Sequence, residues 1–166
     1  MKFEIDVSGY DMFKDTYVIC VAKDDGEIVK GFKFTKKLID DLITNWKSNK
    51  YRYEYNAYEN KRGIFKARIY SVIVYYLFKS IAKPEWVSLT ICRDFKGRTN
   101  EITQNLKFFL ETILKIKMGK PLYQRLQNNS HAHIYANMMR RDTKNLLPTY
   151  VNISLEDIEK FLKKRE

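Results

Sequence analysis

The stretch FEIDVS, residues 3–8, decides the predicted fold. Its apolar residues Phe3, Ile5 and Val7 alternate with polar ones, so they point to one face of a β-strand. Acidic residues are uncommon in strands, yet Asp6 stands in the middle of this one. The polar face of the strand therefore cannot be ordinary core, and its carboxylate needs a separate explanation.

Two further strands follow the first. DTYVICVAKD, residues 15–24, contains an unbroken apolar run typical of a central strand, and GEIVKGFKF, residues 26–34, alternates roughly. Asp25 and Gly26 between them predict a hairpin, because this dipeptide tolerates the positive φ of a tight turn. The chain is expected to open with an antiparallel meander of three strands.

Helices and strands alternate in the rest of the chain. The predicted elements are, in order, a helix after Thr35, a strand or ordered loop at 47–63, a helix over 64–82, a strand over 85–94, a helix from Thr99 to Gly119, a short strand or loop at 120–130, a helix after Ser130 and a helix after Ser154.

This order predicts an α/β fold with a mixed sheet of about five strands and helices on both faces. The length of 166 residues fits one domain over 1–166, in which residues 143–166 form a C-terminal helical extension.

The chain is strongly basic. It has 31 Lys and Arg against 20 Asp and Glu, a formal net charge of +11. Such an excess attracts polyanions, with nucleic acid as the first candidate partner. The alternative is a lysine-rich surface that serves only solubility.

The sequence contains neither a membrane-spanning apolar run nor a recognisable signal peptide. Cys20 and Cys92 both lie in apolar, strand-like runs, which predicts buried free thiols rather than a disulfide. We therefore expect an intracellular, cytoplasmic protein without a membrane association.

A second carboxylate, Asp94, ends the predicted fourth strand. If that strand neighbours the first, Asp6 and Asp94 can meet near one edge of the sheet. Paired carboxylates repel unless a cation joins them, and Mg²⁺ or Mn²⁺ prefers such oxygen ligands. Two ions about 4 Å apart would support phosphodiester hydrolysis. The alternative is that both are strand-end residues bonded to backbone N–H groups.

Two motifs resemble the ribonuclease H-like nuclease superfamily. IDVSGYD, residues 5–11, resembles the "IDxSG" start of several members, among them a family of small proteins whose first motif reads D-E-S-G. LQNNSHAHIYANMMRR, residues 126–141, is similar to the late "LQ…AD…A…RR" helix of that family and to the "HHAH" helix of RuvC-type domains. The resemblance implies a ribonuclease H-like fold with metal ligands in the first strand, after the fourth strand and on a late helix.

The sequence departs from this pattern at three places. Val7 replaces the glutamate of D-E-S-G, and His133 or His131 replaces the late aspartate. The superfamily's middle glutamate has no clear counterpart; Glu54 is the first candidate and Glu59 the second. Either one is alternatively a solvated surface residue.

Only one of the two histidines is expected to face a metal, because residues two apart in a helix point about 200° apart. A helix N-terminus also keeps imidazole neutral and able to bind metal. The alternative for either residue is a hydrogen-bonded histidine near the helix cap.

Three basic segments are predicted to contact nucleic acid. In the first, residues 51–62, tyrosines that could stack on unpaired bases alternate with cations. For each segment the alternative is a solvated face. The predicted contacts are Arg52, Lys61, Arg62, Arg93, Lys96, Arg98, Arg140 and Arg141.

The leading hypothesis is therefore a Mg²⁺- or Mn²⁺-dependent nuclease or resolvase-like enzyme, in which Asp6, Asp94, His133 or His131, and Glu54 form the site. A catalytically incomplete nucleic-acid-binding protein on the same fold is the second hypothesis, and a structural or interaction protein the third. A homodimer would suit a resolvase, although no sequence feature requires one.

Overall fold

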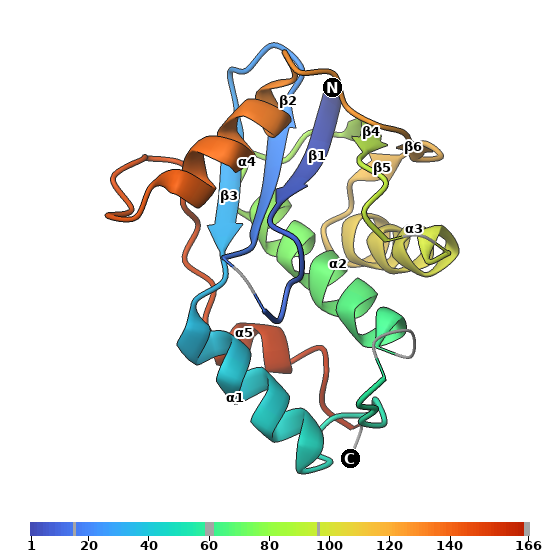
Figure 1. Ribbon diagram of the computed structural model, residues 1–166. Coiled ribbons are helices and arrows are strands. Elements are labelled where there is room, and N and C mark those ends of the chain that lie inside the picture. The colour runs from blue at the N-terminus through green and yellow to red at the C-terminus, as the bar shows by residue number, and fades with distance from the viewer. Residues whose placement is uncertain (15, 59–61, 96, 165–166) are drawn as a thin grey trace.

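A computed structural model describes residues 1–14, 16–58, 62–95 and 97–164 of the chain. Its strands form one six-stranded sheet in the order β3-β2-β1-β4-β5, with β6 also paired to β4 (Figure 1). The elements are β1 (Lys2–Ser8), β2 (Val18–Lys23), β3 (Val29–Lys33), α1 (Lys36–Lys47), α2 (Gly63–Lys79), β4 (Trp86–Ile91), α3 (Thr99–Lys107), the π-helix η2 (Phe108–Ile113), β5 (Lys117–Met118), β6 (Leu122–Tyr123), α4 (His131–Arg141) and α5 (Leu155–Glu159).

Strand β1 lies between the antiparallel and the parallel half of the sheet. It pairs antiparallel with β2, which pairs antiparallel with β3, so the predicted meander of three strands is confirmed. On its other side β1 pairs parallel with β4, with Ile5 opposite Ile91. Strands β1 and β4 therefore end at the same edge of the sheet.

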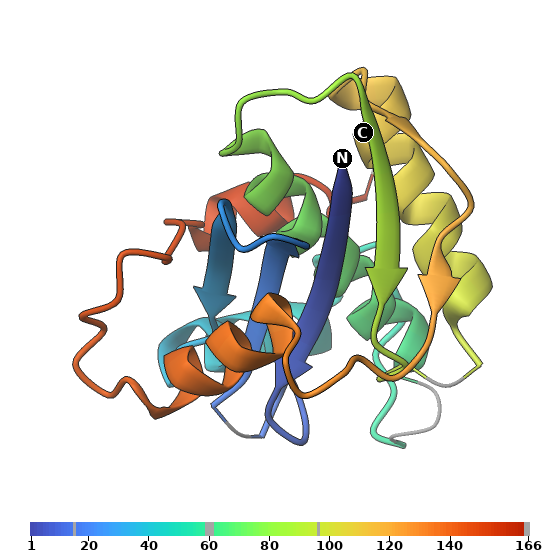
Figure 2. The same cartoon turned by 90° about the horizontal axis from the view of Figure 1, so that it is seen from above.

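Helices cover both faces of the sheet, which confirms the predicted α/β architecture (Figure 2). The side chains of Phe3 and Ile5 point into the main core with the long apolar helix α2. On the opposite face, α4 packs over β1, β2 and β3. The polar face of β1 is thus covered by a helix rather than exposed, and Asp6 is only 3% exposed.

Small residues let α4 approach the sheet closely. Ala132 and Ala136 are fully buried on its inner face. Gly31 of β3 makes room for Met139, because a Cβ at that glycine would lie 2.4 Å from the methionine sulfur. The close approach of α4 brings its polar side chains within reach of β1.

Among the described residues, every helix is too short or too polar to cross a membrane.

The helix that begins at Thr99 ends earlier than the sequence indicates. Its α-helical part continues as η2 and ends near Leu114, where Lys115 adopts a positive φ of 61°. The backbone then enters β5 at Lys117, so the helix does not end at Gly119 as predicted. Strand β5 then pairs parallel with β4.

Among the described residues of the predicted C-terminal helical extension, 143–164, only α5 is helical. Ser154 and Asp157 form the predicted capping box at its start. Helix α5 packs against α1 and α2, and the carboxylate of its buried Glu159 accepts hydrogen bonds from the Tyr51 hydroxyl (2.7 Å) and the Asn45 amide (3.1 Å). Helix α5 is therefore integrated into the core.

The tyrosine-rich loop before α2 also differs from its expected role. Tyr51 is fully buried, and Tyr53 and Tyr55 pack on the rings of Phe65 and Trp46. These rings complete the core instead of offering faces to unpaired bases. Of the tyrosines in this segment, Tyr58 alone is strongly exposed.

Candidate metal centre

The shared end of β1 and β4 brings together the two aspartates that the sequence singled out. The backbone N–H of Cys92 donates to the carbonyl of Ile5 at 3.0 Å, which extends the parallel pairing to the residue beside Asp6. One ligand atom each from Asp6, Cys92 and Asp94 lies within 4.8 Å of the others. The expected proximity of Asp6 and Asp94 is thus present, with a thiol between them in sequence.

Asp6 is buried and held by two hydrogen bonds. The backbone N–H of Val7 donates to its Oδ1 at 2.8 Å, and its Oδ2 lies 2.8 Å from Nδ1 of His133. Within the described residues, neither Asp6 nor Asp94 has a Lys or Arg ion-pair partner. The chain is strongly basic, yet in its described part no Lys or Arg pairs with either of these converging carboxylates, and His133 is the basic side chain beside Asp6.

A series of hydrogen bonds between side chains fixes the orientation of His133. The Ser8 hydroxyl donates to Oδ1 of Asn137 at 2.9 Å, and Nδ2 of Asn137 lies 3.3 Å from Nε2 of His133. An amide nitrogen can only donate, so Nε2 accepts and the imidazole proton is on Nδ1. His133 therefore donates to Asp6, and its ring is a partner of the carboxylate in this arrangement.

The local sequence of α4 explains why these side chains meet. The Ser130 hydroxyl caps the helix by accepting from the N–H of His133. His133 and Asn137 are four residues apart, so they share one face of the helix. That face lies over β1, whose polar face carries Asp6 and Ser8.

Burial and charge shift two of the clustered groups toward their protonated forms. Burial and the neighbouring carboxylates of Asp94 and Asp6 raise the pKa of Cys92 to about 12. Asp94 is open to solvent on one side, but the protein atoms packed around its carboxylate raise its pKa; the Cys92 thiol opposes this shift, and the charge of Asp6 adds to it. A cation among these groups would favour their ionised forms.

The other predicted ligands lie elsewhere. The ring of His131 lies against Gly26 in the β2–β3 turn, where a Cβ at that glycine would be 2.7 Å from the imidazole. Glu54 is exposed on the loop before α2 and is not in the cluster of Asp6. Glu59 lies outside the described residues. The structure thus brings one of the two histidines, and not Glu54, to the aspartate pair.

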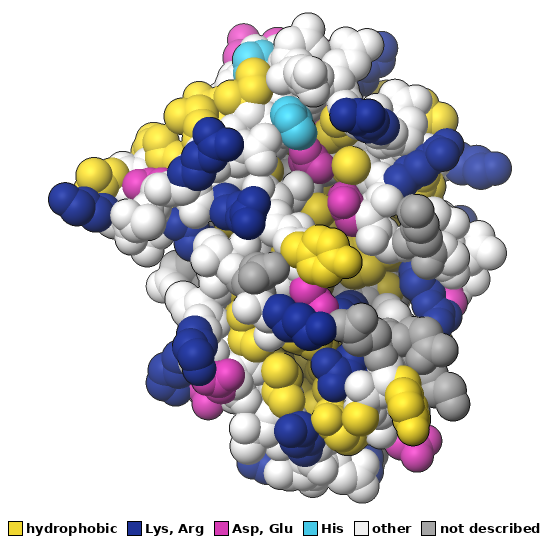
Figure 3. Space-filling model, in the orientation of Figure 1, with side chains coloured by type: hydrophobic (Ala, Val, Ile, Leu, Met, Phe, Trp, Pro, Cys, Tyr) yellow, Lys and Arg dark blue, Asp and Glu magenta, His cyan; other side chains and the backbone are white. Residues whose placement is uncertain are grey.

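A cleft of about 640 Å³ opens beside Asp94. Tyr10, Lys66 and Arg98 line it together with Asp11. Figure 3 shows histidine and acidic side chains close together on this face, with Lys and Arg side chains on both sides of them. The cluster therefore borders a hollow whose lining contains both acidic and basic side chains.

The predicted basic residues occupy several positions around the molecule. Arg93 and Arg98 flank Asp94; Arg93 donates to the Tyr123 carbonyl and Arg98 pairs with Glu101. The remaining described ones are Arg52 beside Tyr53, Arg62 over Trp46 and Tyr55, and the exposed Arg140 and Arg141 at the end of α4. Lys61 and Lys96 lie outside the described residues.

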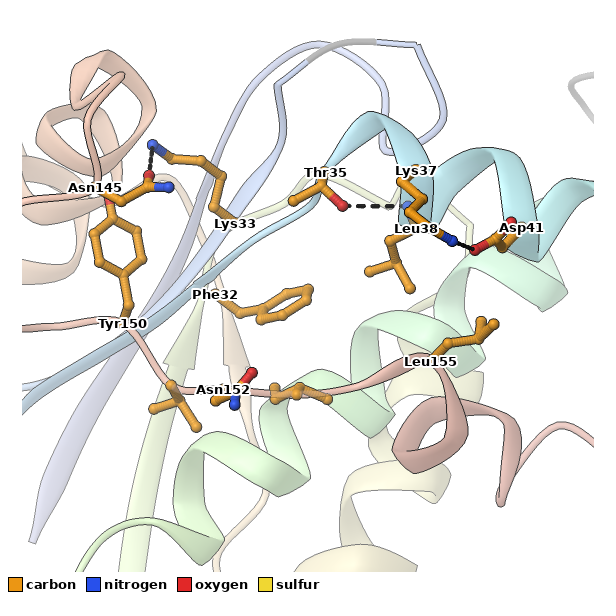
Figure 4. A pocket seen from close by; sticks show the side chains of 12 residues that line it. Phe32, Lys33, Thr35, Lys37, Leu38, Asp41, Asn145, Tyr150, Asn152 and Leu155 are labelled. Atoms are coloured by element: carbon orange, nitrogen blue, oxygen red, sulfur yellow. Dashed lines mark hydrogen bonds and ion pairs between the residues drawn. The ribbon is translucent and has the colours of Figure 1, made fainter.

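A second hollow, of about 510 Å³, lies between β3, α1 and residues 145–155. Figure 4 shows Phe32, Leu38 and Leu155 around it, with Lys37 paired to Asp41 at its rim. None of the clustered groups Asp6, Cys92 and Asp94 lines this hollow. Its mainly apolar wall offers no comparable set of metal ligands.

Three members of the site were not predicted from the sequence. Cys92 follows a strand in which Val87, Leu89 and Ile91 alternate inward, so the same alternation puts Cys92 on the outer face. Ser8 shares the face of Asp6 by the same rule. Asn137 could have been found from its i+4 spacing to His133.

Comparisons with family models, curated proteins and solved structures give no match to this chain. The case for a function therefore depends on the geometry of the site.

Proposed function

We propose that this protein is a divalent-metal-dependent phosphodiesterase of the nuclease or resolvase kind, built on a ribonuclease H-like fold, with nucleic acid as its substrate. The observation that carries the proposal is the convergence of Asp6 and Asp94, without a Lys or Arg partner among the described residues, in a chain of net charge +11. Two adjacent carboxylates of this kind are costly unless a cation binds them.

The donor set fits a divalent cation. Asp6 and Asp94 offer hard oxygen ligands suited to Mg²⁺ or Mn²⁺, and Cys92 adds a softer sulfur. A bound ion would supply Lewis-acid stabilisation of a phosphoryl oxygen and a water of lowered pKa. The three antiparallel strands, the acid in the first strand, the acid after the fourth and the histidine on a late helix support the ribonuclease H-like assignment.

The protein's own residues hold this arrangement in place. Val7 and His133 donate to Asp6 and fix its carboxylate, while Asn137 fixes the ring of His133. Buried hydrogen bonds of this kind keep a ligand in one rotamer and orient its free lone pairs. His133 is therefore proposed as a positioning residue for Asp6.

A non-catalytic nucleic-acid-binding protein is the second candidate. The observation that favours it is the absence of a clustered glutamate in the described part of the chain, since the cluster contains two acids and one thiol. An incomplete ligand set would bind an ion weakly and leave the basic surface as the functional part.

Hydrolysis assays with Mn²⁺ and Mg²⁺ on single-stranded, duplex and branched substrates test the proposal. Asp6→Asn and Asp94→Asn should each lower the rate by at least about 100-fold, because each removes a charged metal ligand. The matched control is Glu4→Gln, which removes a carboxylate from the same strand and the same face outside the cluster.

Each outcome has a clear meaning. Metal-dependent cleavage that survives Asp6→Asn would refute the site. Salt-dependent binding without cleavage in any of these ions would favour the second candidate. Calorimetry with Mn²⁺ should show binding to the wild-type protein and to Glu4→Gln, with weaker binding to Asp6→Asn.

A further inference from the structure

Tyr10 is the most exposed large side chain among those on the rim of the cleft beside Asp94. Tyr10 is 92% exposed, and it lines the cleft together with Asp94. An aromatic ring left open to water beside a charged hollow is suited to stacking on a nucleobase.

The backbone of the loop after β1 places Tyr10 there. Gly9 has φ of +121°, and a Cβ at this position would lie 2.6 Å from the carbonyl oxygen of Thr16. Only glycine fits this conformation, which turns the chain sharply at the end of β1. Asp11 then fixes the loop, because its carboxylate accepts from the N–H of Phe13 at 2.9 Å and pairs with Lys66 at 3.0 Å.

Two cations line the walls of the same cleft. The ammonium of Lys66 pairs with Asp11 and lies over the ring of Phe13, so its position is fixed, and an ammonium has further donors to offer. Arg98 uses one guanidinium nitrogen for Glu101, which leaves other donors for an oxyanion. Gly63 makes room for it, since a Cβ there would lie 2.7 Å from Nε of Arg98.

The size of the cleft agrees with a small ligand. Its volume of about 640 Å³ falls within the range of sites that enclose small molecules, roughly 300–1,000 Å³. An open aromatic face selects for a base that is not stacked in a duplex, whereas Lys and Arg recognise phosphate in any nucleic acid.

We propose that this cleft binds one unpaired nucleotide, with its base on Tyr10 and its phosphate at Lys66 and Arg98, so that a phosphodiester linkage lies beside Asp94. The preferred partner is therefore single-stranded nucleic acid. The inference rests on the proposed function for its reaction, but its binding step does not require the metal.

Fluorescence anisotropy with a short fluorescein-labelled oligothymidylate, in Ca²⁺ and again in EDTA, tests this proposal. The wild-type protein should bind the single strand at least about tenfold more tightly than a duplex of the same length. Tyr10→Ala should weaken single-strand binding about tenfold, while Tyr10→Phe retains it because the aromatic face remains. Arg98→Gln should lower the slope of log K against log salt by about one.

The matched control is Trp86→Ala, which removes another exposed aromatic ring, at the start of β4, that does not line the cleft. It should bind like the wild type. Circular dichroism of each variant identifies any loss of folding, and Tyr10→Phe tests the ring without removing it.

Equal affinity for duplex and single strand, the absence of single-strand binding at low salt, or a Tyr10→Ala variant that binds like wild type would overturn the inference. Tyr10-dependent binding without Mn²⁺-dependent cleavage would support the inference and refute the catalytic function. Asp6-dependent cleavage that Tyr10→Ala leaves unchanged would refute the inference and support the catalytic function.

Discussion

His133 and Asp6 lie 127 positions apart in the sequence, yet Nδ1 of the histidine is 2.8 Å from Oδ2 of the aspartate. The contact joins α4 to the central strand of the sheet. It satisfies a buried carboxylate, and it also places the imidazole at the edge of a group of metal-ligand atoms. The same bond thus contributes to folding and defines the candidate site.

Replacing His133 should destabilise the protein, because the buried carboxylate of Asp6 would lose the imidazole that lies 2.8 Å from its Oδ2. We expect His133→Leu to lower the free energy of unfolding by about 1–3 kcal/mol, as measured by urea denaturation. The double variant with Asp6→Asn should lose less than the sum of the two single changes. His131→Leu is the matched control on the same helix, and an equal loss there would contradict this role of His133.

Cys92 should influence which metal binds. Thiolate ligands favour Zn²⁺ and Cd²⁺, whereas carboxylates favour Mg²⁺ and Mn²⁺. We therefore expect Cys92→Ala to weaken Zn²⁺ binding at least about tenfold in calorimetry and to change Mg²⁺ binding much less. Cys20→Ala is the control, because Cys20 lies opposite Asp6 on β2 but outside the cluster. Equal losses for both ions would exclude a sulfur ligand.

The pair of Asp11 and Lys66 should make stability depend on pH. Burial alone would raise the pKa of Asp11, but the hydrogen bond from Phe13 and the bond and charge of Lys66 outweigh burial, and the pKa lies below its ordinary value of 3.8. The ionised carboxylate therefore stabilises the fold above that value, and the stabilisation is lost as pH falls through the lowered folded-state pKa.

Asp11→Asn should accordingly be less stable than the wild type at pH 7, by about 1–3 kcal/mol, with a difference that shrinks below about pH 4. Denaturation curves across this pH range measure it. Asp40→Asn, which breaks an exposed i,i+4 pair with Lys36, should cost less than about 0.5 kcal/mol. A difference for Asp11→Asn that grows on acidification would contradict the assignment.

Tyr51 should anchor the C-terminal segment to the core. Its hydroxyl donates to the buried carboxylate of Glu159, so Tyr51→Phe removes a charge-assisted hydrogen bond and should cost about 1.5–3 kcal/mol. Tyr53→Phe is the control, because the Tyr53 hydroxyl accepts a hydrogen bond from the exposed Arg52, and its loss should cost much less. Similar costs would mean that α5 is held mainly by its apolar contacts.

The strands and the aspartate pair could be predicted because they follow from local rules. Alternation around Asp6 identified the first strand, and the apolar run before Asp94 identified the fourth. Their juxtaposition required one further assumption, namely that the two strands are neighbours. The parallel pairing of β1 with β4 meets it.

The remaining features depend on tertiary packing that no local pattern reveals. Tyr51 is buried and Tyr55 is half-buried because the rings of Phe65 and Trp46, on two helices, pack against them, and the alternation of tyrosines in the sequence does not show this. Lys66 faces the cleft because α2 lies under the loop that carries Asp11. The turn at Lys115 likewise leads into β5, whose partner β4 is distant in the sequence.

The wide sequence separation of the clustered side chains has a consequence for biosynthesis. Strand β1 leaves the ribosome early, but the carboxylate of Asp6 acquires its imidazole partner only after α4 has been made and docked. In a nascent or truncated chain without α4, the carboxylate of Asp6 on β1 would lack its imidazole partner. The candidate site is therefore incomplete in any chain in which α4 has not yet been made and docked on the sheet.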